Sequence, residues 1–398
     1  MAVRSVGDLD VSGKRVLLRV DFNVPIDEEG RVGDETRILA SLPTIKDLVS
    51  RGARVIAMSH LGRPKGKRVP SMSLAPVAPR LGHHLGREVP FAEDCVGEAA
   101  RGVVSAMKDG DVALLENLRY HPEEEANSAE FAEKLAELGD LYVNDAFGAA
   151  HRAHASTDAL PRLMKDRAAG FLMEKELEYL GGVLEDPARP FVAVLGGAKI
   201  SGKIEVITNL LPRVDRLLIG GGMTYTFLKA KGLSVGRSLV EEDRVSMAAE
   251  LIQASEREGG KIELPVDCVI SDSVKEGGAT DVVSIDAIPG ERYGVDIGPK
   301  TIEKFSGMIR GARTVLWNGP MGIFEVDAYA AGTTALARVA SEATTAGATT
   351  VIGGGDTVAA IAKAGVKDKM SHVSTGGGAS LEFLSGKTLP GVAALETG

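Results

Sequence analysis

The 398-residue sequence contains only two cysteines, Cys95 and Cys268, which lie far apart and lack the spacing of a metal-binding motif. A disulfide framework is therefore not indicated, and two reduced thiols in a cytoplasmic protein are expected. No apolar run reaches the length of a membrane span, and the first residues lack the apolar core of a secretory signal. These absences predict a cytoplasmic protein without a membrane partner.

Acidic residues are missing between Asp47 and Glu88, although the whole chain carries a formal net charge of −9. The overall charge argues against nucleic acid or an anionic membrane as a partner. The acid-free segment is basic, and it contains no aromatic side chain on which a base could stack. It is either a solvated basic face or a wall around an anionic substrate. The second interpretation is favoured because His60 and Arg63 follow a strand-like stretch inside it.

The length and composition indicate a soluble globular protein of two domains. Hydrophobic residues make up 44% of the chain and charged residues 25%, which is ordinary for a globular protein. A chain of 398 residues exceeds the usual size of a single core. The pattern predicts alternating strands and helices throughout, without low-complexity segments.

In the second half, four strand-like stretches run directly into glycine clusters. The stretches are 192–195, 217–219, 350–352 and 372–375, and the clusters are 196–197, 220–222, 353–355 and 376–378. Glycine lets backbone N–H groups approach a ligand closely, and ligands of open α/β sheets bind outside the carboxyl ends of the strands. The pattern therefore predicts one sheet edge that holds phosphates.

In the first half, the strand-like stretches 14–20, 53–58, 112–115 and 141–143 end instead in Asn, His and Arg side chains. Arginine offers a planar fork that matches carboxylate and phosphate. This composition suits a small, multiply charged anion, so the two halves predict two sites on two sheets. Residues 171–184 between the halves predict a helix, which is either an interdomain helix that takes part in a hinge motion or an ordinary packing helix.

Several residues of the second half are candidates for nucleotide chemistry. Residues 197–204 nearly match the phosphate-binding loop G-x-x-x-x-G-K-[ST], but Ile204 replaces the hydroxyl residue that would bind Mg²⁺. Lys199 and Lys203 are one helical turn apart, so they are either a phosphate clamp or two surface lysines. Asp356 is either a Mg²⁺ ligand or a helix cap. Glu325, close after a sharp turn at 317–320, could accept hydrogen bonds from a ribose.

Taken together, the motifs of nearly the whole chain resemble those of the phosphoglycerate kinase family and occur in the order of that family. These motifs are RVDFNVP at 19–25, SHLGRP at 59–64, ENLR at 116–119, HRAH at 151–154, GGAK at 196–199, WNGP at 317–320, GGGDT at 353–357 and STGGGA at 374–379.

The resemblance implies a fold of two doubly wound, Rossmann-like parallel-sheet lobes joined by an interdomain helix. It implies a phosphoglycerate-binding domain over residues 1–170 and a nucleotide-binding domain over 171–387 that includes the helix 171–184. The tail 388–398 is expected to return to the first domain. The implied reaction is reversible in-line transfer from 1,3-bisphosphoglycerate to MgADP, giving 3-phosphoglycerate and MgATP, between lobes that close in a monomeric enzyme.

The resemblance also implies three groups of site residues. The catalytic group contains Arg37, Lys199, Lys203, Gly355 and Gly378. The phosphoglycerate group contains Asp21, Phe22, Asn23, Arg37, His60, Leu61, Gly62, Arg63, Arg119 and Arg152. The nucleotide group contains Lys203, Gly294, Glu325, Gly354, Gly355, Asp356 and Thr357, with Asp356 as the Mg²⁺ ligand.

Two other classes of function are alternatives to the one that this resemblance implies. A dinucleotide-dependent dehydrogenase normally shows G-x-G-x-x-G after a strand, and this sequence lacks that fingerprint. A non-catalytic nucleotide- or anion-binding protein of the same fold should have lost phosphate-contacting residues, whereas all the expected ones are present. Transfer to a carboxylate also needs no general base, because that group is already ionised at neutral pH.

Overall fold

The computed structural model describes residues 3–396, and their contacts divide the chain into two compact units. Unit 1 takes in the residues up to Glu178 and those from Thr388 onward, and unit 2 runs from Tyr179 to Lys387. The division falls inside helix α7 (Phe171–Glu185), so this helix contributes residues to both units. Among residues 3–396, no helix is both long enough and apolar enough to cross a membrane.

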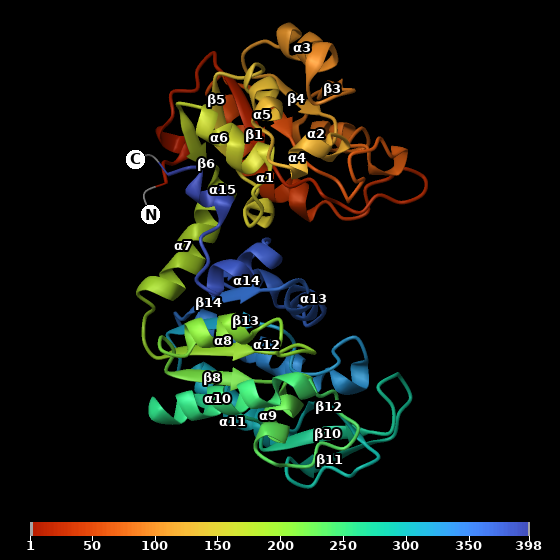
Figure 1. The fold of residues 1–398 in the computed structure, drawn as a ribbon, viewed down its shortest axis with the longest axis vertical. Helices are drawn as coiled ribbons and strands as arrows, with labels where there is room; N and C mark the ends of the chain where they lie inside the picture. Colours follow the sequence, from red (N-terminus) through yellow and green to blue (C-terminus); the bar gives the residue numbers. More distant parts are fainter. Residues whose placement is uncertain (1–2, 397–398) are drawn as a thin grey trace. The chain divides into compact units, whose positions relative to one another are not determined.

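Unit 1 contains a six-stranded sheet in the order β3-β4-β2-β1-β5-β6, and every pairing in it is parallel (Figure 1). The strands are β1 (Arg15–Arg19), β2 (Arg54–Met58), β3 (Phe91–Ala92), β4 (Val112–Leu115), β5 (Leu141–Asn144) and β6 (Arg167–Ala169). Buried parallel strands form from near-continuous apolar runs, as β4 illustrates with four buried residues. Strands β2, β3 and β4 lie on one side of β1, and β5 and β6 then lie on its other side, which is the doubly wound pattern.

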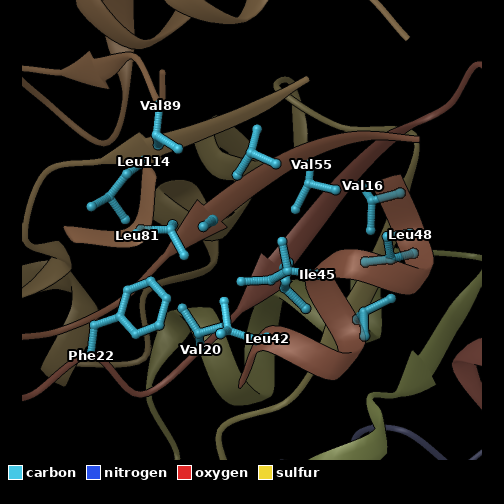
Figure 2. Packing of buried hydrophobic residues seen from close by; sticks show 14 of the residues in the cluster. Val16, Val20, Phe22, Leu42, Ile45, Leu48, Val55, Leu81, Val89 and Leu114 are labelled. Atoms are coloured by element: carbon cyan, nitrogen blue, oxygen red, sulfur yellow. The ribbon is translucent and has the colours of Figure 1, made fainter. Parts of the chain in front are cut away.

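The helices of unit 1 bury apolar faces against this sheet. They are α1 (Thr36–Ser50), α2 (Val77–Leu85), α3 (Gly97–Ala106), α4 (Pro122–Glu125), α5 (Ala129–Ala136), α6 (Leu160–Leu163) and α15 (Pro390–Ala393), together with the 3-10 turn η3 (Leu118–Tyr120). Figure 2 shows Leu42, Ile45 and Leu48 of α1 packed with Val16 and Val55 of the sheet. Helical spacing of these three leucine and isoleucine residues gives α1 one buried face.

Two further features complete unit 1. Asp145, directly after β5, accepts hydrogen bonds at Oδ1 from the backbone N–H groups of Leu172 (2.9 Å) and Met173 (3.3 Å), which anchors the first turn of α7. The C-terminal segment also belongs here, since Gly391 donates its N–H to the carbonyl of Ala150 at 2.9 Å. Leu389 and Val392 of this segment are buried.

Unit 2 contains a second six-stranded parallel sheet, in the order β15-β14-β13-β7-β8-β9. Its strands are β7 (Phe191–Leu195), β8 (Arg216–Ile219), β9 (Ile262–Glu263), β13 (Thr314–Asn318), β14 (Thr349–Gly353) and β15 (His372–Val373). The strand order reverses between β7 and β13, which makes their carboxyl ends the switch point where α/β sheets bind ligands. The prediction of two doubly wound α/β lobes is confirmed.

The helices of unit 2 follow the strands in alternation over most of the unit (Figure 1). Besides the end of α7, they are α8 (Ile204–Leu210), α9 (Thr224–Ala230), α10 (Val245–Arg257), α11 (Pro299–Arg310), α12 (Ala331–Thr345), α13 (Gly355–Lys363) and α14 (Gly378–Leu384). Helices α13 and α14 both begin at glycines of the predicted phosphate-binding clusters.

The prediction of strand–helix alternation throughout the chain is wrong in one region. The strands β10 (Asp267–Ser271), β11 (Thr280–Ser284) and β12 (Tyr293–Ile297) form an antiparallel sheet in the order β11-β10-β12. The segments that join them are too short to hold a crossover helix, so neighbouring strands must run in opposite directions. This small sheet carries Gly294 of the predicted nucleotide group.

Candidate functional site

Arg19, the last residue of β1, is the centre of the polar cluster at the strand ends of unit 1. Its side chain is fully buried, and its Nε donates to the hydroxyl of Ser156 at 2.9 Å. Its Nη2 lies 3.1 Å from Nδ1 of His60, which follows β2. A buried guanidinium holds its charge and requires hydrogen-bond partners, so Arg19 gives this sheet edge a fixed positive charge.

Asp21 and Arg37 form an ion pair beside this cluster. Nη1 of Arg37, in the first turn of α1, lies 2.9 Å from each carboxylate oxygen of Asp21. The Asp21 side chain is 12% exposed and that of Arg37 is 38% exposed, so the pair lies at the surface of unit 1 with the guanidinium open to solvent. Asp21 thus orients a cation that keeps unused donors for a ligand.

The loop after β2 is held from both sides by predicted site residues. Asn23 accepts the backbone N–H of Gly62 at 2.9 Å, and Arg119 of η3 donates to the carbonyl of Gly62 at 2.7 Å. Asn117 supports the same loop by accepting the N–H of Leu61 at 3.1 Å. These bonds between loops that follow β1, β2 and β4 fix the relative positions of the predicted phosphoglycerate residues.

The pKa values of His60, His154 and Arg119 are lowered, in part because positive charges lie close together in this cluster. Burial, followed by the charges of Arg19 and Arg119, holds the pKa of His60 well below its usual value. Burial and the same two arginines lower the pKa of His154 to about 3, and burial followed by Arg19 lowers the pKa of Arg119 to about 10. Both histidines are therefore neutral at physiological pH, and the cluster favours a bound anion.

The remaining predicted phosphoglycerate residues take different positions. Arg63 is exposed, and Arg152 is half-buried with its Nε 3.1 Å from Nε2 of His151. Phe22 and Leu61 belong to the hydrophobic core of unit 1, so only the backbone of these two residues can face a ligand.

In unit 2, a cavity of about 350 Å³ lies at the switch point of the sheet. Its walls are mostly apolar and glycine-rich, with carboxylates at Asp296, Glu325 and Asp356. It brings together the predicted Gly294, Glu325 and Asp356 with Gly197, Gly221, Gly222, Tyr225 and Pro320. A largely apolar cleft with a few polar groups is typical of a small-molecule site.

Lys203 lies immediately before α8, and its ammonium group donates a hydrogen bond to the side-chain oxygen of Asn318 at the end of β13. Burial lowers the pKa of Lys203 to about 8, while the Asp356 carboxylate acts in the opposite direction. The expectation that Lys199 and Lys203 share a helical turn is wrong, because the segment between them forms bends and turns and α8 begins only at Ile204. Lys199 is exposed.

The strand-end glycines serve two different purposes. A Cβ on Gly196 would lie 2.1 Å from the carbonyl oxygen of Pro320, and one on Gly319, at φ +106°, would lie 2.2 Å from the carbonyl oxygen of Gly196. These glycines allow neighbouring turns to pack against each other. A Cβ on Gly355 would meet nothing within 4 Å, so open space remains there for a ligand.

The starts of α13 and α14 present backbone donors at this sheet edge. Gly355 and Gly378 are the first residues of these helices, and the first N–H groups of a helix have no partner within it. Gly354, at φ +85°, occupies the cap position of α13, so Asp356 is not the helix cap. Thr357 is buried, and its hydroxyl accepts the N–H of Gly319 at 2.6 Å.

Sequence reasoning missed several residues that shape these sites. Arg19 and Asn318 lie within the motifs at 19–25 and 317–320. Each is a polar residue at the end of an apolar strand, and this pattern could have identified both as site residues. Tyr225 contacts Gly294 so closely that a Cβ on Gly294 would lie 1.8 Å from the tyrosine oxygen. Nothing in the sequence pattern pairs these two residues, because the contact joins α9 to β12.

The comparisons with known proteins agree with this geometry. The family model described as phosphoglycerate kinase matches residues 6–387. The chain belongs to the phosphoglycerate kinase family. A phosphoglycerate kinase of Chlorobium limicola is 55% identical over 395 residues, which cover 99% of this chain and 100% of that protein.

Solved structures of phosphoglycerate kinases are similar over the same extent. The structure from Coxiella burnetii has a TM-score of 0.92 at 41% sequence identity and covers 99% of each chain. The structure from Pyrococcus horikoshii has a TM-score of 0.84 at 34% identity and covers 98% of each chain. Membership of the phosphoglycerate kinase family is therefore supported by sequence and by fold.

Proposed function

We propose that the chain catalyses reversible phosphoryl transfer from 1,3-bisphosphoglycerate to MgADP, giving 3-phosphoglycerate and MgATP. The observation that carries this proposal is the presence of two chemically different sites, one in each unit. Unit 1 gathers cationic side chains around neutral histidines, and unit 2 has a cavity with glycine turns and helix starts. The family membership supports the same reaction and does not support the alternative of a non-catalytic binding protein.

In unit 1, we assign binding of the phosphoglycerate to the side chains of Asp21, Asn23, Arg37, His60, Arg63, Arg119 and Arg152. Arg37 is assigned to the transferring phosphoryl group, because Asp21 orients it while its guanidinium stays partly open to solvent. Phe22, Leu61 and Gly62 supply backbone and packing. We propose that residues 1–170, with the tail 388–398, form the phosphoglycerate-binding domain and that residues 171–387 form the nucleotide-binding domain.

In unit 2, we assign the nucleotide to the cavity that Gly294 and Glu325 line. Lys199, Lys203 and the N–H groups of Gly355 and Gly378 stabilise negative charge on the phosphoryl oxygens. Gly354 and Thr357 shape the turn from which α13 begins.

Asp356 fits the role of a Mg²⁺ ligand. It is an exposed carboxylate in the first turn of α13, at the wall of the cavity, and Mg²⁺ is commonly held by one or two carboxylates plus substrate phosphates. The bound ion would neutralise phosphate charge during transfer. Without the ion, the Asp356 carboxylate would repel the phosphates of the nucleotide.

The reaction needs no general base, since the carboxylate of 3-phosphoglycerate is ionised at neutral pH. Direct transfer requires the two reacting oxygens to approach the same phosphorus atom, so we infer that the units close during turnover. A monomeric, cytoplasmic enzyme of glycolysis is part of the same proposal.

The test is a coupled assay in both directions with purified, folded protein, Mg²⁺ and each substrate pair. We expect ATP formation from ADP and 1,3-bisphosphoglycerate, and ADP formation from ATP and 3-phosphoglycerate. Absence of transfer in both directions would contradict the proposal. Binding of both ligands without transfer would instead favour the non-catalytic alternative.

A further inference from the structure

A second polar cluster in unit 1 lies outside the proposed phosphoglycerate group and has no part in the reaction described above. It consists of Asp94, Cys95 and His121. One carboxylate oxygen, the thiol sulfur and one imidazole nitrogen all lie within 4.8 Å of one another. The three side chains offer three of the ligand types that bind zinc in proteins.

The parallel sheet brings these residues together. Asp94 and Cys95 follow β3, and His121 follows β4 by way of η3. Strands β3 and β4 are neighbours, with Ala92 opposite Leu115, so the segments after them leave the sheet at the same edge (Figure 1). The sheet thus brings the two segments that carry the cluster to one edge.

The cluster combines a buried thiol with two partly exposed ligands. Cys95 is fully buried, whereas the side chains of His121 and Asp94 are 28% and 32% exposed. A cation can therefore enter from the side of His121 and Asp94, and a water molecule can complete its coordination. Three protein ligands and one water form the arrangement of an open tetrahedral zinc site.

Existing contacts hold the ligands in place before any cation binds. Oδ1 of Asp94 lies 2.7 Å from Nε2 of His121 and accepts the backbone N–H of Cys95 at 2.7 Å. The His121 ring stacks on Phe131 with 5.1 Å between the centroids, which fixes the plane of the imidazole. Such preorganisation lowers the cost of binding.

We propose that Asp94, Cys95 and His121 form a binding site for a zinc-class divalent cation. On binding, the S–H bond of Cys95 breaks, a metal–sulfur bond forms and the proton passes to solvent, with no change of oxidation state. The hydrogen bond between Nε2 of His121 and Oδ1 of Asp94 gives way to bonds to the metal, and the neutral imidazole, bound through Nε2, carries its proton on Nδ1. A thiolate and an imidazole select Zn²⁺ or Cd²⁺ over Mg²⁺, which prefers oxygen ligands. The site is therefore independent of the magnesium that accompanies the nucleotide.

The positively charged side chain of Arg68 lies next to Asp94 and disfavours binding of a metal cation there. Nη2 of Arg68 lies 3.5 Å from Oδ2 of Asp94, on the carboxylate oxygen that does not face His121. The Arg68 side chain is 57% exposed, so the pair is screened by solvent and weak. Removal of Arg68 should thus strengthen cation binding by a small factor.

The test uses chelator-treated full-length protein, excess Mg²⁺ and Cd²⁺ as the probe. We expect a thiolate-to-metal charge-transfer band that saturates at one Cd²⁺ per chain, and competition by Zn²⁺. The matched control is Cys268→Ser, which removes the other buried thiol and should leave the band unchanged. Calorimetry in buffers of different ionisation enthalpy should report release of a proton.

Ligand variants decide where the cation binds. Cys95→Ser should abolish the band. His121→Gln should weaken Cd²⁺ binding by roughly 100-fold or more, since the loss of a residue that only supports a metal ligand already costs about 10- to 100-fold. Arg68→Ala should strengthen it by about 2- to 5-fold, the usual range for a surface pair. Circular dichroism establishes that each variant is folded. Absence of a band in the wild-type protein, or equal binding by wild type and folded His121→Gln, would overturn the proposal.

Discussion

The two units share a sheet topology, but the proposed site of unit 1 consists mainly of side chains and that of unit 2 mainly of backbone. Unit 1 uses charged side chains at strand ends, where Arg19 and Arg119 are buried. Burial of His60, followed by these two charges, lowers the pKa of His60 and keeps its imidazole neutral. Unit 2 uses backbone geometry, with tightly packed glycine turns, two helix starts at glycine and one half-buried lysine, Lys203.

This difference follows from the ligands we propose. A small anion with charged ends is recognised by fixed cations that point at each end. A larger nucleotide that carries its own metal ion needs a surface of suitable shape and backbone donors near its phosphates. One topology therefore supports two kinds of recognition, because the strand-end residues vary while the sheet does not.

The side-chain nature of the unit 1 site is tested most severely by Arg37→Ala. We expect kcat to fall by about 100- to 1000-fold, because one preorganised donor to the transferring phosphoryl group is lost. The affinity for 3-phosphoglycerate should change little, since other cations hold the ground-state anion. Steady-state kinetics and direct binding separate these effects.

The matched control for Arg37→Ala is Arg31→Ala. Arg31 is 74% exposed at its side chain and pairs with Asp27 at 2.8 Å, away from the cluster. Its removal should leave kcat unchanged. A large loss of 3-phosphoglycerate affinity in Arg37→Ala at unchanged kcat would place Arg37 in ground-state binding only.

The backbone nature of the unit 2 site is tested by two glycine substitutions. Gly355→Ala adds a methyl group into open space at a helix start, so stability should be unchanged while the rate falls by about 10- to 100-fold through misplaced phosphates. Gly319→Ala should instead lower the free energy of unfolding by about 2 kcal/mol or more, since its Cβ meets backbone. Thermal unfolding and kinetics measured together distinguish the two roles. Full activity of Gly355→Ala would show that the space at Gly355 is not used by a ligand.

Lys203, a half-buried cation of unit 2, predicts a pH dependence. Because burial lowers the pKa of Lys203 to about 8, the ammonium loses its charge above this pH, and nucleotide affinity should fall by up to about 10-fold per pH unit. Lys203→Arg keeps its charge and should remove this dependence, whatever its absolute affinity. The measurement is ADP binding between pH 7 and about 9. An unchanged slope in Lys203→Arg would assign the dependence to another group.

The same pKa has the opposite consequence for stability. Between pH 8 and the ordinary lysine value of 10.5, the unfolded state binds more protons at this position than the folded state. The contribution of Lys203 to the free energy of unfolding therefore increases as pH rises through this range. Nucleotide binding and stability should thus change in opposite directions.

The smallest expected effect concerns Asp356→Ala. We expect MgADP affinity to fall by about 10-fold, or ~1.4 kcal/mol, while 3-phosphoglycerate affinity is retained. When Mg²⁺ is chelated, the variant should bind ADP at least as tightly as wild type, because without the ion the carboxylate only repels the phosphates. Calorimetric titration of each ligand provides the check. Equal losses for both ligands would indicate a structural role.

Much of this architecture could be predicted from local sequence. Apolar runs such as residues 192–195 identified buried strands, and the residues after them identified the sheet edges that carry both proposed sites. The antiparallel sheet of β10 to β12 was missed because β11 is largely exposed and has little apolar signal. The Gly294–Tyr225 contact was missed because it depends on tertiary packing between α9 and β12. The sequence also could not tell the glycines that allow turns to pack closely, such as Gly319, from those that leave open space, such as Gly355, because this depends on the neighbouring turns in the fold.

The return of the C-terminal segment to unit 1 has a consequence for biosynthesis. Gly391 is bonded to Ala150, and Leu389 and Val392 are buried in unit 1, yet all three are synthesised after the whole of unit 2. A growing chain therefore has every residue of unit 2 before unit 1 has its last helix. On the ribosome, the unit whose synthesis begins first is therefore completed last, and the backbone of Ala150 lacks its partner Gly391 until the C-terminal segment has been made.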